Sequence, residues 1–132
     1  MLIITALSTS ILCLLHIFLS FRVVNFRRKH KISVGDGGNQ ELLRAIRTQA
    51  NLTEYAPLAM ILLGCLELNG APWFLCLLLA GAFVAGRILH PVGLKEDDAL
   101  SVRVLAMQLT FVSIIAMAVF NILWLIWLLF SG

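Results

Sequence analysis

Charge is scarce in this sequence of 132 residues, of which only 13% are Asp, Glu, Lys or Arg and 61% are hydrophobic. The mean hydropathy is +0.97. Soluble domains carry about twice as much charge, so this composition excludes a water-soluble globular protein and indicates a membrane protein. Charged residues are wholly absent from residues 1–21 and 104–130, and Arg87 is the only one in residues 71–89.

Four segments approach or exceed the roughly 20 mostly apolar residues that a membrane-spanning helix needs. They are residues 1–21, 45–66, 71–89 and 104–130, and the second is interrupted by polar residues. No basic residues precede the first segment and no small-x-small cleavage site follows it, so we expect a retained helix and no signal peptide. The predicted fold class is an all-α membrane protein, a bundle of four transmembrane helices that forms one domain over residues 1–132.

Basic residues are missing from the second connection, residues 67–72, and gather around the other two connections. By the positive-inside rule, the first and third connections are cytoplasmic and both termini are external. Tryptophans favour the membrane interface, and Trp73, Trp124 and Trp127 all fall toward the opposite, external end. The two signals predict the same orientation.

Cysteine is also scarce, and the three residues Cys13, Cys65 and Cys76 have no spacing typical of a zinc site. Because they lie in apolar runs and are odd in number, we expect small core residues, with no metal and no disulfide framework. The net charge of +3 comes from residues that flank hydrophobic segments. Membrane topology and contacts with anionic lipid head groups account for most of it, and we expect no nucleic-acid partner.

What the sequence does contain is a polar entrance to its second apolar segment. Gly-rich residues 35–39 break any helix there, and Asn39 can cap a helix beginning near Gln40. At helical spacing, the four side chains Arg44, Arg47, Asn51 and Glu54 form one stripe, from which Gln49 points away.

This stripe has two interpretations. Charge is costly inside a bilayer and usually marks a functional site. Two guanidinium groups, an amide and a carboxylate could bind a ligand that carries both carboxylates and an ammonium group. Alternatively, an ion pair between Arg47 and Glu54, or with a neighbouring helix, simply holds helices together. The residues alone leave both open.

The third connection carries a second polar group. Arg87 and His90 are three residues apart, and we expect Pro91 to end the third helix there. Arg103 precedes the long apolar run 104–130, where a cation is well placed beside something anionic. Membrane topology alone would also explain Arg103, and helix capping would explain Arg87 and His90.

The pattern Arg47-x-Gln49-x-Asn51-x-x-Glu54-Tyr55-x-Pro57 resembles the second-helix signature of the membrane-associated proteins in eicosanoid and glutathione metabolism, the MAPEG family. Length, four helices and external termini match over essentially the whole chain, which looks like a bacterial member. The resemblance implies a homotrimer with glutathione bound between subunits near the cytoplasmic face, and a lipophilic second substrate arriving from the bilayer. It implies Arg103 as the catalytic residue that stabilises the thiolate. The implied glutathione-binding residues are Arg27, Arg28, Arg47, Gln49, Asn51, Glu54, Tyr55, Arg87 and His90.

One departure is that Leu94 stands where relatives carry a tyrosine. The leading prediction is a glutathione-dependent transferase or peroxidase of the bacterial inner membrane that acts on lipophilic electrophiles or hydroperoxides. A small proton-coupled multidrug-type transporter that uses Glu54 is one alternative, and a noncatalytic membrane protein is another. The neighbouring Arg47 argues against the transporter, because it keeps a carboxylate ionised.

Overall fold

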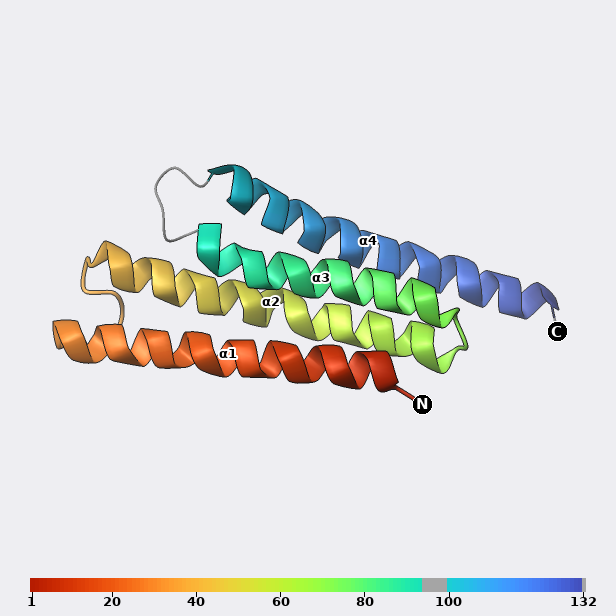
Figure 1. Cartoon of the computed structure of the whole chain (residues 1–132), viewed down its shortest axis with the longest axis horizontal. Helices are drawn as coiled ribbons and strands as arrows, with labels where there is room; N and C mark the ends of the chain where they lie inside the picture. The colour runs from red at the N-terminus through yellow and green to blue at the C-terminus, as the bar shows by residue number, and fades with distance from the viewer. Residues whose placement is uncertain (94–99, 132) are drawn as a thin grey trace.

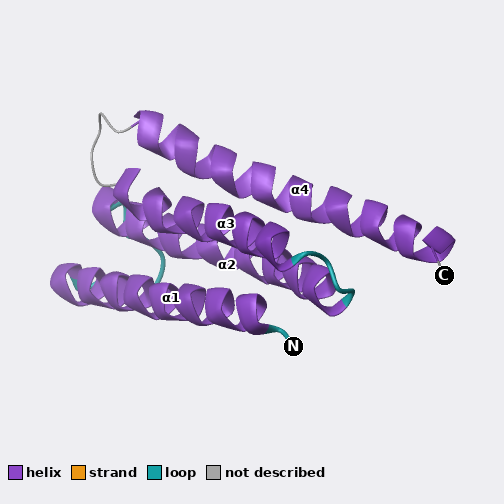
Figure 2. Ribbon diagram, turned by 45° about the vertical axis from the view of Figure 1, so that its right-hand side comes forward, coloured by secondary structure: helices purple, strands orange, loops and turns teal. Residues whose placement is uncertain are grey.

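The computed structural model describes residues 1–93 and 100–131, which form four α-helices. They are α1 (Ile3–His30), α2 (Gln40–Leu68), α3 (Trp73–Gly93) and α4 (Leu100–Ser131). The helices run side by side in alternating directions, so both chain termini lie at one end of the bundle (Figure 1). Helices α2 and α3 lie between α1 and α4 (Figure 2). The prediction of an all-α fold with four helices is confirmed.

Three of these helices are long and apolar enough to cross a membrane, within residues 3–30, 73–92 and 100–130. Helix α2 is different because its first four turns are polar. Its uninterrupted apolar part, residues 55–66, spans only about 18 Å, against about 30 Å of hydrocarbon in a bilayer. The sequence predicts four spans, whereas length and composition support three. Helix α2 would need other protein around its polar half.

The connection between α1 and α2 follows the turn signals of the sequence. Helix α1 ends at His30 and is capped by Lys31, whose φ of 55° lies in the left-handed region. Helix α2 begins at Gln40, and the Asn39 side chain accepts a hydrogen bond of 2.9 Å from the Leu42 backbone N–H. Both the start of α2 and its cap are confirmed.

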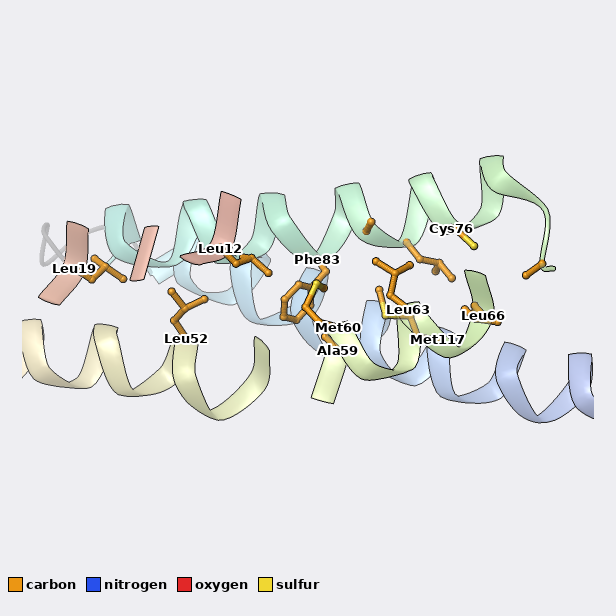
Figure 3. Packing of buried hydrophobic residues seen from close by; sticks show 13 residues of the cluster. Leu12, Leu19, Leu52, Ala59, Met60, Leu63, Leu66, Cys76, Phe83 and Met117 are labelled. Atoms are coloured by element: carbon orange, nitrogen blue, oxygen red, sulfur yellow. The ribbon is translucent and has the colours of Figure 1, made fainter. Parts of the chain in front are cut away.

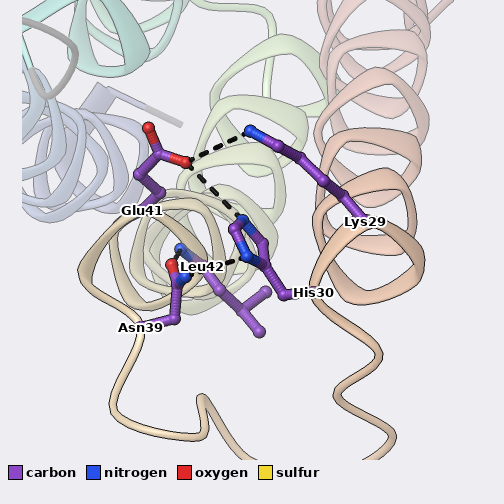
Figure 4. A network of polar contacts seen from close by, with 5 residues as sticks. All are labelled: Lys29, His30, Asn39, Glu41 and Leu42. Carbon is purple, nitrogen blue, oxygen red and sulfur yellow. Dashed lines mark hydrogen bonds and ion pairs between the residues drawn. The ribbon is translucent and has the colours of Figure 1, made fainter.

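Polar contacts tie the end of α1 to the start of α2 (Figure 4). The Asn39 side chain lies 3.2 Å from His30 Nδ1. A Glu41 carboxylate oxygen lies 3.8 Å from Lys29 Nζ and 3.7 Å from His30 Nε2. Solvent-exposed ion pairs contribute little stability, so the cap has the larger local effect.

The main core lies along the middle of the bundle and joins all four helices (Figure 3). Phe83 of α3 and Met117 of α4 are fully buried there beside Leu63 of α2. Most apolar side chains of α1 and α4 remain exposed instead. This inside-out distribution suits a surrounding of lipid.

Tryptophans and basic residues separate to opposite ends of the bundle. Trp124 donates a hydrogen bond of 2.8 Å to the Asn69 carbonyl, and its ring lies 4.9 Å from that of Trp127. These residues and Trp73 mark the end with the termini, while the basic end of α1 lies at the other. The segregation inferred from the sequence is therefore present in three dimensions.

Two expectations were wrong in detail. Pro91 lies inside α3, which continues to Gly93, because a proline this near a helix end removes only one hydrogen bond. The three cysteines were expected in the core, but only Cys76 is buried, whereas Cys13 and Cys65 are exposed. Helix α4 begins at Leu100, so Arg103 lies in its first turn.

Candidate functional site

The polar stripe of α2 opens onto a cavity of about 320 Å³ at the basic end of the bundle. Helix α2 contributes Arg44, Arg47 and Asn51, which lie three and four residues apart and therefore on one face. Residues from the end of α3 and the start of α4 complete the wall. The full lining is Leu43, Arg44, Arg47, Asn51, His90 and Arg103.

Behind this cavity, α3 inserts a buried arginine. Arg87 is only 1% exposed, and its Nη2 donates a hydrogen bond of 2.7 Å to Asn51 Oδ1. Its guanidinium carbon lies 5.9 Å from the centre of the Tyr55 ring, a distance typical of a cation–π contact. The Tyr55 ring in turn meets Phe111 of α4 edge-on at 5.5 Å. A chain of contacts thus runs from Asn51 through Arg87 and Tyr55 to Phe111 and joins helices α2, α3 and α4.

The site leaves several buried nitrogens without a hydrogen-bond partner in the described part of the chain. They are Arg87 Nε, Arg87 Nη1 and His90 Nδ1. Buried polar groups are normally paired, because leaving one unpaired costs about 1–3 kcal/mol. Of these atoms, only His90 Nδ1 belongs to a residue that lines the cavity, so a polar ligand bound there could pair with it.

The electrostatics of the cavity favour an anion. Three arginines line it, and no Asp or Glu is among its described lining residues. Arg103 lies in the first turn of α4, where the helix dipole disfavours a cation. Neighbouring like charges in a partly apolar surrounding repel one another. A ligand with carboxylates or another anionic group would offset both the helix-dipole effect on Arg103 and the repulsion among the arginines.

Of the predicted site residues, six are brought together by this one chain. Arg47, Asn51, His90 and Arg103 line the cavity. Arg87 and Tyr55 pack behind Asn51, as described above. Arg44, which the sequence placed in the stripe without a separate role, belongs to the same wall.

Four predicted residues lie elsewhere within the chain. Gln49 points to α1, where its Nε2 donates to Ser20 Oγ at 2.8 Å. Glu54 lies on an exposed part of α2 outside the cavity lining. Arg27 donates to the carbonyls of Ser33 and Gly35, and Arg28 shares a separate surface hollow with it. Leu94 is outside the described residues.

Sequence reasoning missed two other features. One is an apolar groove of about 270 Å³ between α1 and α2, whose wall includes Cys13, His16, Thr53 and Pro57. His16 Nδ1 lies 3.4 Å from Thr53 Oγ1, so this histidine makes a polar contact between α1 and α2. The other is Glu67, whose carboxylate accepts hydrogen bonds from the start of α1, more than sixty residues away. From the sequence, only the 3.6-residue periodicity of α1 and α2 could have indicated that these two helices contact each other.

Comparison with known proteins identifies the family to which this chain belongs. The model of the MAPEG family matches residues 5–129. The chain belongs to the MAPEG family. The Inner membrane protein YecN of Escherichia coli K12 is 33% identical over 129 residues, which cover 97% of this chain and 98% of that protein. YecN of Escherichia coli O6:H1 has the same identity and coverage.

Family membership gives the cavity a chemical context. MAPEG proteins are membrane-associated proteins in eicosanoid and glutathione metabolism, and the match covers all four helices. The resemblance first noted in the second-helix signature therefore extends to the whole chain. The name of YecN specifies a membrane but no reaction.

Proposed function

We propose that this MAPEG protein is a glutathione-dependent membrane enzyme, a transferase or peroxidase acting on lipophilic electrophiles or hydroperoxides. The observation that carries the proposal is the convergence of Arg47, Asn51 and Arg103 from two helices on one donor-rich cavity. Glutathione has two carboxylates and a thiol, so it can place negative charge against several arginines at once.

The arginines have separable roles in this proposal. Arg44 and Arg47, adjacent on one face of α2, would hold a carboxylate of glutathione. Arg103, on the opposite wall, would stabilise the thiolate. A free thiol has a pKa of about 8.5, and a nearby guanidinium lowers it, which raises the fraction of the nucleophilic form at neutral pH. In conjugation, the thiolate sulfur bonds to the electrophilic carbon while the leaving group departs with its bonding electron pair. In peroxide reduction, it attacks the terminal hydroperoxide oxygen, the O–O bond breaks and the alcohol leaves after taking up a proton. The resulting glutathione sulfenic acid then reacts with a second glutathione to give glutathione disulfide and water.

A homotrimer is part of the proposal. Glu54 and Arg47 are exposed on the α2 face of a single chain, and charge facing lipid is costly. Packing of this face against further copies would shield both residues. In the trimer, Glu54 would meet the ammonium group of glutathione, and Arg28 or Arg27 of a neighbouring copy would meet its second carboxylate.

The cellular location of the protein and the entry routes of its two substrates follow from the proposed membrane topology. We place the protein in the bacterial inner membrane, as the name of YecN indicates for that relative, with α2 as a fourth span. Both termini are external and the cavity is near the cytoplasmic face, by the positive-inside rule. Glutathione would enter from the cytosol, and the lipophilic substrate would arrive sideways from the bilayer.

Calorimetry of glutathione binding to the purified protein in detergent tests the proposal. We expect saturable binding by the wild type and a loss of at least about tenfold in Arg47→Ala, which removes a charge-assisted hydrogen bond. Arg22→Ala is the matched control, because Arg22 faces Phe26 on α1 and does not line the cavity. Absence of binding by a folded wild type would overturn the glutathione assignment.

The alternatives are separated by Glu54→Gln. A proton-coupled transporter would lose export completely, since the neutral amide cannot carry a proton. The enzyme would bind glutathione more weakly and retain some turnover of an organic electrophile. A noncatalytic protein would lose trimer stability and show no turnover in either form.

A further inference from the structure

The largest fully buried side chain in the described structure is that of Arg87. A buried arginine normally pairs with a carboxylate, which can accept two parallel hydrogen bonds from the guanidinium. Here the hydrogen-bond partner is the Asn51 amide, and two of the three guanidinium nitrogens stay unpaired in the described chain. The Arg87–Asn51 pair therefore holds α2 and α3 together less effectively than an arginine–carboxylate pair would.

The chemistry of the two groups determines how the Asn51 amide is turned. A guanidinium only donates hydrogen bonds, so the Asn51 atom 2.7 Å from Arg87 Nη2 must be the carbonyl oxygen. An asparagine amide has its acceptor on one side and its two N–H donors on the other. With the oxygen directed at Arg87, the amino group is turned away from it.

Asn51 borders the cavity and Arg87 does not. Arg87 therefore acts on the cavity through the amide and does not reach it. If the residue facing Asn51 could accept a hydrogen bond, the amide could rotate and present its oxygen to the cavity. A ligand carboxylate would then be repelled.

We infer that Arg87 is a positioning residue that locks the Asn51 amide with its amino group toward the cavity, so that Asn51 donates to an anionic oxygen of the ligand. This deepens the proposed function, on which it rests. Together with Arg44, Arg47 and Arg103, the oriented amide makes the wall rich in donors. The site thereby selects glutathione by its carboxylates over neutral thiols of similar size.

A double-mutant cycle tests the inference, with glutathione affinity measured by calorimetry for the wild type, Asn51→Ala, Arg87→Gln and the double variant. A glutamine side chain can both donate and accept, so the Arg87→Gln substitution releases the amide. We expect each single variant to lose about tenfold in affinity and the double variant to bind like Asn51→Ala alone. Arg87→Lys is the rescue control, because an ammonium also only donates, and it should bind within about threefold of the wild type.

The outcomes are distinct. If the losses of the two single variants multiply in the double variant, Arg87 acts by its own charge and the inference is overturned. The same holds if Asn51→Asp, which gives Arg87 a better partner but removes the donor, binds glutathione as well as the wild type. A thermal unfolding midpoint for Asn51→Asp at or above that of the wild type, together with lost binding, supports the inference. If the wild type binds no glutathione, the proposed function and this inference both fail.

Discussion

At the scale of single residues, Glu67 caps a helix that is distant from it in the sequence. The first turn of α1 has no capping side chain of its own. Glu67, at the end of α2, supplies the cap. Its two oxygens accept hydrogen bonds of 2.9 Å from the backbone N–H groups of Ile4 and Thr5, and one also accepts from Thr5 Oγ1 at 2.8 Å. A carboxylate at a helix N-terminus also complements the dipole.

Replacing Glu67 with alanine should destabilise the fold by about 1 kcal/mol, the usual effect of losing an N-terminal cap. Thermal unfolding in detergent measures this difference. Glu41→Ala is the control, because its exposed contacts with Lys29 and His30 are long and should contribute less than about 0.5 kcal/mol. Equal effects of both substitutions would contradict the assigned role of Glu67.

The stabilisation by Glu67 should also depend on pH. Partial burial would raise the pKa of the Glu67 carboxyl, but the donors of α1, from Thr5 and Ile4, together outweigh it and lower the pKa. A carboxyl with a lowered folded-state pKa stabilises fully above the unfolded value of about 4.3 and loses its effect as the pH falls through the folded-state pKa. The difference between wild type and Glu67→Ala should therefore stay constant from neutral pH to about pH 5 and disappear in stronger acid. A difference that grows on acidification would contradict this mechanism.

At the scale of helices, close approach of α3 and α4 builds the wall behind the cavity. A Cβ atom added at Gly86 would lie 2.9 Å from the Ala106 carbonyl oxygen, so only glycine permits this packing. Gly86 directly precedes Arg87, and the contact therefore sets the depth at which the arginine enters the bundle.

Gly86→Ala should destabilise the protein by about 1–3 kcal/mol, because α4 must move to admit the methyl group. Gly81→Ala is a matched control on the same helix, since a Cβ there meets nothing within 4 Å. That substitution should be neutral or stabilise by up to about 1 kcal/mol through helix propensity. Denaturant unfolding of both variants checks the prediction, and a Gly86→Ala protein as stable as Gly81→Ala would refute it.

At the scale of the whole molecule, the polar face of α2 is the exposed surface that fits least well with a single chain surrounded by lipid. Helices α1 and α4 expose apolar side chains, as a lipid-facing surface should. The exposed face of α2 instead combines Arg47 and Glu54 with apolar residues further along. Contact between copies over this face would resolve the conflict, and it would complete the proposed glutathione site by bringing Glu54 to it.

The proposed trimer can be tested by two equivalent substitutions. Ile61 on α2 and Ile122 on α4 are similarly exposed, at 62% and 59%. Ile61 lies seven residues beyond Glu54 and thus on the same face, whereas α4 is on the outside of the bundle. Native mass spectrometry should find three chains for the wild type and for Ile122→Trp, and dissociation for Ile61→Trp. A monomeric wild type would exclude the trimer.

Much of this protein was determined by the sequence itself. The long uncharged runs of α1 and α4, the tryptophans at one end and the lysines and arginines at the other dictate a helical membrane protein, because burying backbone in lipid requires helices. The start of α2 and its Asn39 cap were also predictable, because capping and turn signals act within a few residues. The stripe of Arg47 and Asn51 followed from helical periodicity alone.

Tertiary structure decided which of these polar residues work together. The cavity exists because α3 and α4 bring His90 and Arg103 to the α2 stripe, and no local signal encodes that meeting. The same packing sent Gln49 to α1, left Glu54 outside the cavity and turned the Asn51 amide toward Arg87. Periodicity places a side chain on a helix face, but only the packing of neighbouring helices determines what that face meets.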